Sequence, residues 1–203
     1  MAVLFKFKCF LIVLAIFVLN QNTCVFGYGL GSCPKYNLMK NFNITRFMGH
    51  WYEIERSFYL LELTAGCTTI ELQENLDGKI EVVARVINKW TGGESTSEGI
   101  AVISKRNPSI LKYKVNSALP TAIARLLPGA GFYQVLHTDY NNFAILWTCS
   151  NLLLAHADQV WILGRKREIS VPLRAQIYKQ LSNLRIDSDR LIISKNANCP
   201  ENE

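Results

Sequence analysis

The chain has 203 residues, 49% of them hydrophobic, and a formal net charge of +6 at pH 7. Its basic residues are scattered as single residues and pairs, with one cluster at Arg165-Lys166-Arg167, whereas nucleic-acid binding needs a stripe of them. We therefore expect no nucleic-acid partner, and the length suits one domain with a sizeable core.

Residues 1–27 have the layout of a secretory signal peptide. Two lysines precede an apolar run from Phe10 to Leu19, and Val25-Phe26-Gly27 fits a cleavage site. The run is short for a membrane span, although an uncleaved anchor is the other interpretation. Removing the segment takes away two lysines and no acidic residue, so the net charge falls from +6 to +4. We predict a signal peptide at 1–27, a mature domain at 28–203, and a secreted, extracellular protein.

Most of the mature chain alternates between apolar and polar residues with a period of two, as half-buried β-strands do. A tight-turn signal at Asp77-Gly78 separates two of these segments. Eight such strands in series, joined mostly by short turns, imply an up-and-down barrel or a sandwich. The predicted strands are Gly49–Phe58, Thr68–Gln73, Ile80–Ile87, Ser97–Ser104, Ile110–Val115, Phe132–Thr138, Phe143–Cys149 and Gln159–Arg165.

One segment near the end of the chain has helical periodicity instead. Ser170 can cap a helix that carries Pro172 in its first turn. Apolar residues follow at helical spacing, at Leu173, Ile177, Leu181 and Leu184. Because this helix has one apolar stripe, we expect it to pack on the outside of the sheet. A short strand at Arg190–Ser194 follows it.

The cysteines of the mature chain indicate disulfide bonds. Four remain after the signal, namely Cys33, Cys67, Cys149 and Cys199, and an even number in an exported chain predicts two disulfides with three connectivities open. No Cys-x-x-Cys pair or Cys/His cluster indicates a metal site. Asn43-Ile44-Thr45 is an N-glycosylation acceptor, although Asn43 could instead cap a short helical turn.

Three motifs resemble those of the lipocalin family. The stretch FMGHWYEIER at 47–56 resembles the family's Gly-x-Trp motif, with Gly49 and Trp51 in the motif positions. Thr138-Asp139-Tyr140 resembles the second motif, and Arg165 resembles the arginine that closes strand eight. The resemblance implies an all-β fold, an eight-stranded antiparallel up-and-down β-barrel with one C-terminal α-helix packed outside. It also implies the pairings Cys33–Cys149 and Cys67–Cys199, with a structural rather than catalytic role.

The resemblance implies a binding cavity inside the barrel, because eight strands can enclose one small ligand. Anchoring the alternation on inward-pointing Trp51 and Arg165 gives the lining. It consists of Ile70, Leu72, Val82, Ala84, Val86, Gly99, Ala101, Leu111, Tyr113, Tyr133, Val135, Leu146 and Trp161. His137, Gln159 or Tyr113 could orient one end of a ligand, although each also fits a satisfied wall residue. The apolar set would equally fit a dry core.

The expected function is that of a secreted carrier for a small hydrophobic ligand: a lipid, sterol, fatty acid, retinoid or pheromone-like molecule. We expect no cofactor, no catalytic residue and a monomer or weak oligomer. One alternative is a tetrapyrrole carrier for bilin or haem, with His137 as the internal axial ligand. Another is a lipocalin-type isomerase, which would need a free cysteine inside the barrel, and an empty barrel with a structural role is a third.

The loops at the expected open end are unusually apolar. Since loops normally face water, apolar side chains at the mouth suggest contact with a membrane or a lipoprotein surface. A lid that covers only its own ligand is the other interpretation. The loops are Tyr59–Leu63, Asn88–Trp90, Ala122–Leu127 and Leu152–Leu154.

At the other end of the barrel, we expect Trp51 to point inward and close the floor, with the guanidinium of Arg165 over its indole ring. Asp139 and Tyr140 should border the same end. Glu53 has the same parity as Trp51, so it should point into the base with Arg165 as its partner, unless a strand bend turns Glu53 and its neighbour towards water.

Overall fold

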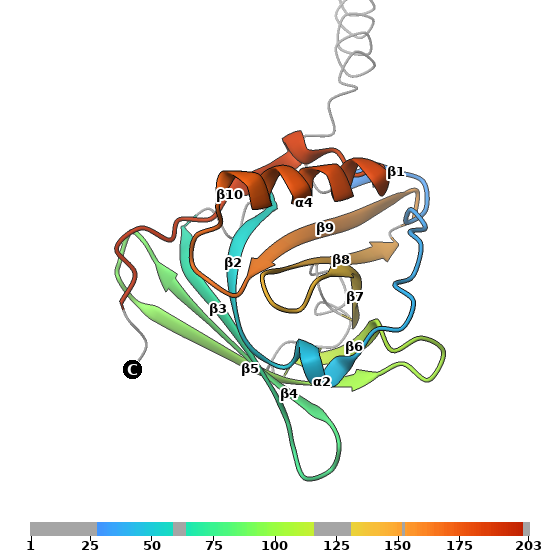
Figure 1. The fold of residues 1–203 in the computed structure, drawn as a ribbon, viewed down its shortest axis with the longest axis horizontal. Helices are drawn as coiled ribbons and strands as arrows, with labels where there is room; N and C mark the ends of the chain where they lie inside the picture. The colour runs from blue at the N-terminus through green and yellow to red at the C-terminus, as the bar shows by residue number, and fades with distance from the viewer. Residues whose placement is uncertain (1–27, 59–63, 116–130, 152, 201–203) are drawn as a thin grey trace, which may run out of the picture.

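The computed structural model describes residues 28–58, 64–115, 131–151 and 153–200. The predicted signal peptide at 1–27 and the predicted apolar loops at 59–63 and 122–127 lie outside these residues. Eight antiparallel strands, β2 to β9, each pair with the next in the sequence, and β9 pairs with β2, so the sheet closes into a barrel (Figure 1). The predicted architecture is confirmed.

The barrel strands coincide with the segments of period-two alternation, most of them extended by a few residues. Their bounds are β2 Gly49–Ser57, β3 Ala65–Glu74, β4 Ile80–Asn88, β5 Glu94–Ile103, β6 Ile110–Val115, β7 Gly131–Thr138, β8 Phe143–Asn151 and β9 Ala155–Gly164. The short helix α2 (Ile44–Phe47) precedes β2 at the closed end of the barrel. The other end is open, and there β2 is followed by β3, β4 by β5, β6 by β7 and β8 by β9.

Two further strands extend the sheet where the barrel strands diverge. Strand β1 (Tyr28–Leu30) pairs with the first residues of β9, and β10 (Leu191–Ile193) pairs with the last residues of β2. Strand β2 pairs with β3 only from Gly49 to Tyr52. Nearer the open end, Lys195, which follows β10, forms a β-bridge with Gly66 of β3. The C-terminal segment therefore completes the wall between β2 and β3 near the open end.

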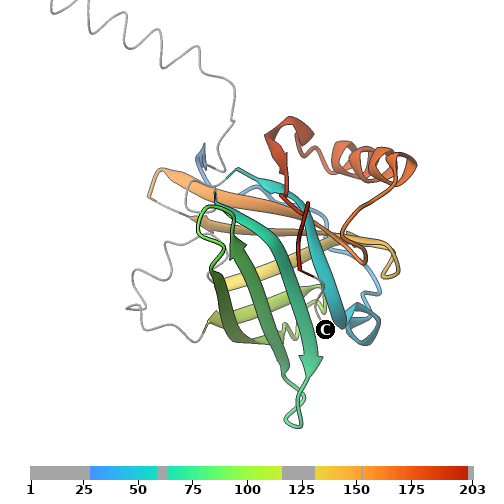
Figure 2. The same cartoon turned by 90° about the vertical axis from the view of Figure 1, so that its left-hand side faces the viewer.

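A second core lies outside the barrel, under the helix α4 (Val171–Asn183). The helix begins as predicted, with the Ser170 hydroxyl accepting a hydrogen bond from the backbone of Leu173 and Pro172 in the first turn. Ile177 and Leu181 are fully buried against outward-facing residues of β8 and β9. Figure 2 shows the helix lying outside the barrel wall.

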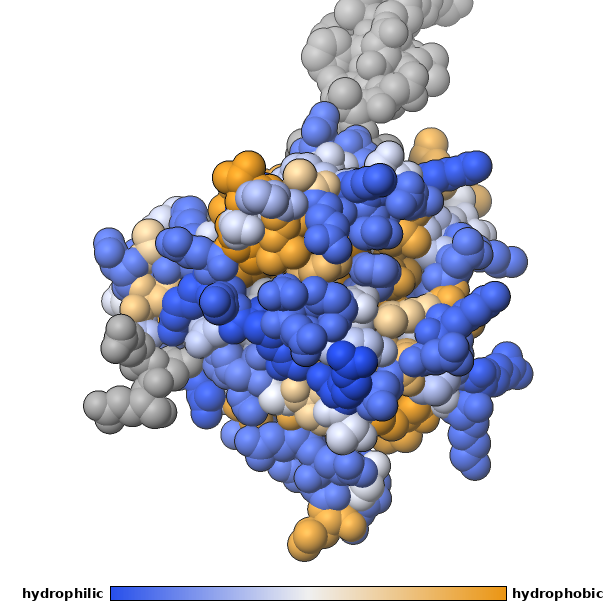
Figure 3. All heavy atoms as spheres, viewed as in Figure 1, coloured by the Kyte–Doolittle hydropathy of each residue, from blue (hydrophilic) through white to orange (hydrophobic). Residues whose placement is uncertain are grey.

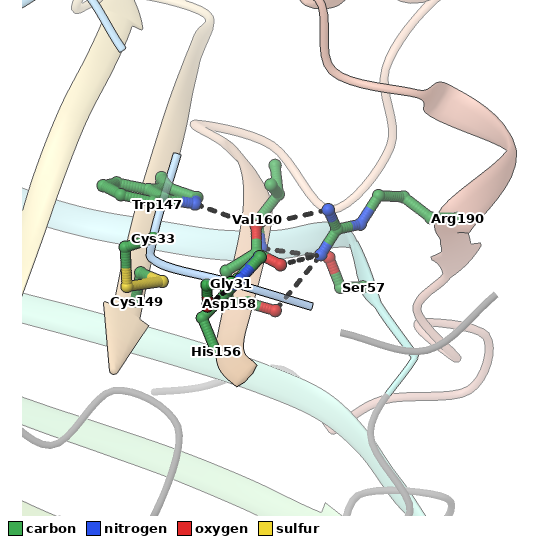
Figure 4. Close-up of polar contacts among 9 residues, drawn as sticks. All are labelled: Gly31, Cys33, Ser57, Trp147, Cys149, His156, Asp158, Val160 and Arg190. Atoms are coloured by element: carbon green, nitrogen blue, oxygen red, sulfur yellow. Dashed lines mark hydrogen bonds and ion pairs between the residues drawn. A yellow bond between two sulfur atoms is a disulfide. The ribbon is translucent and has the colours of Figure 1, made fainter. Parts of the chain in front are cut away.

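A buried ion pair ties the C-terminal segment to the barrel on this outer side (Figure 4). Asp158 in β9 accepts hydrogen bonds from Arg190 at 2.8 and 3.2 Å, and from the indole Nε1 of Trp147 at 3.0 Å. Arg190 belongs to the 3-10 helix η2 (Ser188–Arg190) that leads into β10. Because both side chains are largely buried, this pair positions the segment that completes the wall.

The exterior is mostly hydrophilic on the face drawn in Figure 3, with a hydrophobic area over α4 and β10. Val171 of the helix and Ile193 of β10 are exposed large apolar residues of those two elements. Within the described part of the chain, no helix has the length and hydrophobicity that crossing a membrane requires.

Candidate ligand cavity

The barrel encloses a cavity of about 300 Å³, lined mainly by apolar side chains. Eleven of the residues predicted from strand parity surround it: Ile70, Leu72, Val82, Ala84, Val86, Ala101, Leu111, Tyr113, Tyr133, Leu146 and Trp161. They come from β3 to β9, because each barrel strand turns alternate side chains inward. The parity argument thus located the cavity wall.

Two predicted lining residues lie inside the barrel but do not border the cavity. Val135 is fully buried in the inner core. A side-chain carbon at Gly99 would lie 2.5 Å from the ring of Tyr113, so the space above this glycine holds that ring. The prediction that Gly99 leaves room for a ligand was wrong, because the tyrosine fills the room.

The prediction that His137 points into the barrel was wrong. The register between β7 and β8 shifts between Val135 and His137, which indicates a β-bulge. A bulge reverses the parity of the residues that follow, and the ring of His137 lies 5.6 Å from that of Phe143 in the outer core. Burial lowers the pKa of His137, which Asp139 partly opposes. An axial haem ligand at this position is therefore excluded from the cavity.

Gln159 is the other predicted polar lining residue. It has the parity of Trp161 and is buried, but it lies beside Thr148 and does not border the cavity. Its amide nitrogen makes no hydrogen bond to any residue of the described chain.

The parity list omitted five residues that line the cavity: Phe47, Glu53, Thr68, Ser97 and Leu163. Phe47 lies in α2, where strand parity gives no information. Thr68 and Leu163 have the same parity as predicted residues on their own strands, so the alternation could have found them. Ser97 and Glu53 are polar, and a search for an apolar wall leaves such residues out.

Trp51 and Arg165 close the floor of the barrel as predicted. Trp51 is fully buried, and the guanidinium carbon of Arg165 lies 3.6 Å from the centroid of its ring. The Arg165 guanidinium also donates hydrogen bonds of 2.8–3.4 Å to the carbonyls of Arg46, Phe47, Met48, His50 and Tyr140. One side chain thus joins α2, the start of β2 and the β7–β8 turn.

Gly49 allows the chain to enter β2 below this arginine. Its φ of +90° lies in the region that residues with a side chain rarely adopt, and a side-chain carbon there would meet the guanidinium at 3.6 Å. In the Gly-x-Trp motif, Gly49 therefore supplies the backbone conformation with which the chain enters β2, and Trp51 supplies the side chain that closes the floor.

The Thr138-Asp139-Tyr140 motif forms the turn between β7 and β8. Asp139 Oδ1 accepts hydrogen bonds from the backbone N–H groups of Asn141, Asn142 and Phe143 at 2.8–3.1 Å. Burial acts to raise the pKa of Asp139, but these bonds and one from the Asn142 side chain outweigh it and lower the pKa. Asp139 thus acts as an ionised turn anchor at the closed end.

The two glutamates of β2 point to opposite sides of the wall, because the β2–β9 register shifts between Glu53 and Glu55. Glu53 faces inward as predicted, but its partner is not Arg165. Its Oε1 accepts hydrogen bonds from Arg56 Nε at 3.0 Å and from Ser194 Oγ at 2.6 Å. Burial raises the pKa of Glu53, while Arg56 and the Ser194 hydroxyl act to lower it.

Glu55 faces the helix α4. It is fully buried and accepts hydrogen bonds from the guanidinium of Arg174 and from the hydroxyl of Tyr178 at 2.9 Å. The bulge therefore turns one glutamate to an outer ion pair and leaves the other inside the barrel.

A second, more polar space of about 260 Å³ lies towards the open end. Its lining is Glu53, Arg56, Thr64, Ala65, Thr68, Val86, Asn88 and Ser95. Glu53, Thr68 and Val86 also line the apolar cavity, so the two spaces adjoin.

Both predicted disulfides are present. Cys33–Cys149 joins the N-terminal segment to β8, and Cys67–Cys199 joins the C-terminal tail to β3. All four cysteines of the described chain are therefore paired, and the thiol on which the isomerase alternative depends is missing from these residues. No group of His, Cys, Asp and Glu in the described residues could hold a metal ion.

Asn43 is the N-cap of α2 and is exposed. Its side-chain oxygen accepts a hydrogen bond from the backbone of Arg46 at 3.0 Å. Because capping uses the oxygen and glycosylation modifies the amide nitrogen, the two roles are compatible, and glycosylation of Asn43 stays a prediction.

A family model described as a lipocalin-like domain matches residues 42–196. The chain therefore belongs to the lipocalin-like family.

Two of its relatives are apolipoprotein D and Lazarillo. Apolipoprotein D of Oryctolagus cuniculus is 31% identical over 176 residues, covering 86% of this chain and 87% of the relative. The Lazarillo protein of Schistocerca americana is 28% identical over 161 residues, covering 78% of this chain and 72% of the relative. Among solved structures, insecticyanin from the tobacco hornworm Manduca sexta superposes with a TM-score of 0.68 at 21% identity, covering 84% of this chain and 89% of that one. At that identity, the superposition shows a shared fold.

Proposed function

We propose that this protein is a secreted carrier that holds a small hydrophobic ligand in the barrel cavity. The observation that carries the proposal is the space of about 300 Å³ inside the barrel, with a mainly apolar and aromatic lining. A ligand that buries about 300 Å² of apolar surface there gains roughly 7 kcal/mol before the losses of immobilisation, which is compatible with about micromolar affinity. The proposed ligand classes are sterols, fatty acids, retinoids and pheromone-like molecules.

Secretion belongs to the same proposal. The two disulfides suit an oxidising compartment, and the predicted signal at 1–27 would direct the chain there. A carrier function needs no catalytic residue and no cofactor.

Filling part of the cavity should weaken ligand binding. Ala84 lines the cavity, and Val83 is its neighbour on the same strand with its side chain on the opposite face. Replacing Ala84 by phenylalanine is expected to weaken binding at least about tenfold, because the new ring occupies ligand volume. The measurement is quenching of tryptophan fluorescence on titration with retinol, cholesterol, palmitate or biliverdin, the last of which tests the bilin alternative.

The matched control is Val83→Phe, which adds the same ring to the outer face and should leave the affinity unchanged. Equal losses in both variants, or undiminished binding in Ala84→Phe, would show that the ligand lies elsewhere. If none of the four ligands quenches the wild-type protein, the carrier proposal is contradicted.

A contact between the open-end rim and a lipid surface is a second proposal. Three described rim residues are large, apolar and strongly exposed: Trp90 at 79%, Leu153 at 101% and Leu154 at 81%. Leu30, at the end of β1, is exposed at 92% and lies close to Leu154, because the N–H of the next residue, Gly31, donates to the Leu154 carbonyl at 2.9 Å. Apolar groups gathered at the mouth suit transfer of a ligand from a membrane or lipoprotein.

Replacing Trp90, Leu153 and Leu154 together by serine should reduce liposome binding by at least about tenfold, because each lost side chain removes apolar burial in the lipid. Flotation with phosphatidylcholine vesicles measures it. Leu76→Ser is the control, since Leu76 is just as exposed but lies in the β3–β4 turn at the closed end. Unchanged flotation of the triple variant would refute the rim proposal and leave the cavity proposal intact.

A further inference from the structure

The disulfide that holds the C-terminal tail lies beside a lysine. Lys89 follows β4, and its side chain crosses Gly66 of β3, where a side-chain carbon would lie only 2.5 Å from Lys89 Cε. The ammonium donates to Cys67 Sγ at 3.1 Å and to the Ala197 carbonyl at 3.0 Å, and it lies 4.0 Å from Cys199 Sγ. A positive charge is therefore held against this disulfide, closest to the sulfur of Cys67.

Other charged residues near Cys67 do not offset this charge. Arg85, Glu94 and Arg167 line a small pocket together with Cys67, and Arg85 pairs with Glu94 at 3.9 Å. Among the described residues, Lys89 is the charged side chain that hydrogen-bonds to the sulfur atoms. The surroundings of this disulfide are thus positive.

The other disulfide provides a comparison within the same molecule. In each bond a partly exposed cysteine, Cys33 or Cys199, is joined to a buried one, and the buried partners Cys149 and Cys67 are both 5% exposed. Among the described residues, however, neither Cys33 nor Cys149 accepts a hydrogen bond from a lysine or an arginine. The two bonds therefore differ in neighbouring charge more than in exposure.

A neighbouring cation favours the opening of a disulfide by thiol exchange. The reaction is faster when the sulfur that leaves belongs to a thiol of lower pKa, and a lysine next to a thiol lowers its pKa. Cys199 is partly exposed and can be attacked, whereas Cys67 is buried with its sulfur against the ammonium. Attack at Cys199 thus releases the sulfur that Lys89 stabilises as a thiolate.

A dithiol supplies the electrons for this reaction. One of its thiolates bonds to Cys199 Sγ, the bond to Cys67 breaks, and the electron pair leaves on Cys67. The second thiolate then attacks the first sulfur of the dithiol and displaces Cys199. The dithiol is oxidised to a disulfide, the protein disulfide takes up two electrons, and the two thiol protons pass to the released cysteines or to water.

The bond to Cys199 is the covalent link between the C-terminal segment and β3. The segment pairs with β2 through β10, and it contacts β3 through the bridge of Lys195 to Gly66 and through the Cys67 N–H, which donates to the Lys195 carbonyl at 3.1 Å. The polar space that adjoins the cavity is lined by residues of both β2 and β3. Loss of the covalent link would weaken the wall next to this space.

We propose that the Cys67–Cys199 disulfide is a thiol-reducible link, activated by Lys89, and that its reduction by a dithiol releases the C-terminal segment from β3 and opens the barrel wall. Cys33–Cys149 is the lasting bond. Reduction and release are both measured without a ligand, so their failure would leave the carrier function untouched.

The rates at which dithiothreitol opens the two disulfides of the native protein test the reducibility. Samples alkylated with iodoacetamide at successive times, at neutral pH, are digested and analysed by mass spectrometry to identify the released cysteines. Cys67 and Cys199 should be released at least about tenfold faster than Cys33 and Cys149. Equal rates, or faster opening of Cys33–Cys149, would overturn the proposal.

Lys89→Met removes the charge and keeps nearly the same side-chain length. It should slow the opening of Cys67–Cys199 about fivefold and leave the rate of Cys33–Cys149 unchanged, because the leaving thiolate loses its counter-charge. If Lys89 only tethers the tail through Ala197, its loss would loosen the tail and speed the reaction instead. The sign of the change therefore decides, and an unchanged or faster rate refutes the role of Lys89.

Two further lysine variants check that result. Lys89→Arg keeps the charge and should retain most of the wild-type rate, whereas a rate as slow as that of Lys89→Met would contradict the electrostatic role. Lys79→Met removes an exposed lysine from the β3–β4 turn at the closed end and should open Cys67–Cys199 at the wild-type rate.

Hydrogen–deuterium exchange followed by NMR tests the release of the segment. Combining Cys67→Ser with Cys199→Ser should raise exchange of the amide at position 67 at least about tenfold, because the segment that accepts its hydrogen bond is no longer held. Cys33→Ser with Cys149→Ser is the matched control and should leave that amide protected. If the first pair fails to fold, wild-type protein reduced only at Cys67–Cys199 gives the same readout. Wild-type protection of this amide without the bond would refute the release.

Discussion

Replacing Asp158 by asparagine should lower the free energy of unfolding by about 3–5 kcal/mol, the usual range for breaking a buried ion pair. The change removes the charge that balances Arg190 and disturbs the hydrogen bond from Trp147. Because Arg190 ends η2 and directly precedes β10, which pairs with β2, the wall between β2 and β3 should open as well. Urea denaturation, monitored by circular dichroism, measures the loss.

Asp77→Asn is the matched control. Asp77 also pairs with a cation, Lys79 at 3.6 Å, but both side chains are exposed, and such surface pairs contribute about 0–1 kcal/mol. Combining Asp158→Ala with Arg190→Ala should cost less than the sum of the single changes, because the double variant leaves no buried charge unpaired. A stability equal to wild type in Asp158→Asn would mean that the pair does not position the C-terminal segment.

Replacing Arg165 by alanine is expected to cost about 3 kcal/mol, or roughly 6–12 °C in melting temperature for a chain of this size. The variant loses the cation–π contact with Trp51 and the hydrogen bonds to five backbone carbonyls. Those carbonyls belong to three segments that meet at the floor. The floor should therefore loosen.

Lys166→Ala serves as the control, since the neighbouring lysine is exposed and its removal should change stability by less than about 0.5 kcal/mol. Arg165→Lys should recover part of the loss, because an ammonium keeps the charge but cannot reach all the carbonyls that the planar guanidinium reaches. Differential scanning calorimetry compares the three, and an unchanged melting temperature in Arg165→Ala would contradict the role of this arginine in the floor.

Strand parity predicted the wall because it depends only on the pleat. Wherever a strand is regular, as from Val82 to Val86, every second residue faces the cavity and the sequence alone identifies it. The prediction was wrong at His137 because an extra residue in β7 shifts the register there, and a bulge has no reliable sequence signal. A register shift between β2 and β9 likewise turns Glu53 and Glu55 to opposite sides of the barrel wall.

The partners of buried charges could not be predicted from the sequence. Arg165 seemed the natural partner of Glu53, yet its guanidinium is occupied by backbone carbonyls, and Glu53 pairs with Arg56 and Ser194. Ser194 is 141 residues away from Glu53, and it meets it only because β10 lies beside β2.

The sequence by itself determined the alternation that makes eight strands, the Gly49-x-Trp51 entry and the inward set of apolar residues, because these depend on local backbone geometry. The tertiary structure decided which residues meet: the register shifts, the β10 segment in the wall, and the polar group at one end of the cavity. The reason is physical. Side-chain direction along a strand repeats every two residues, whereas contacts between distant segments depend on how the whole sheet closes.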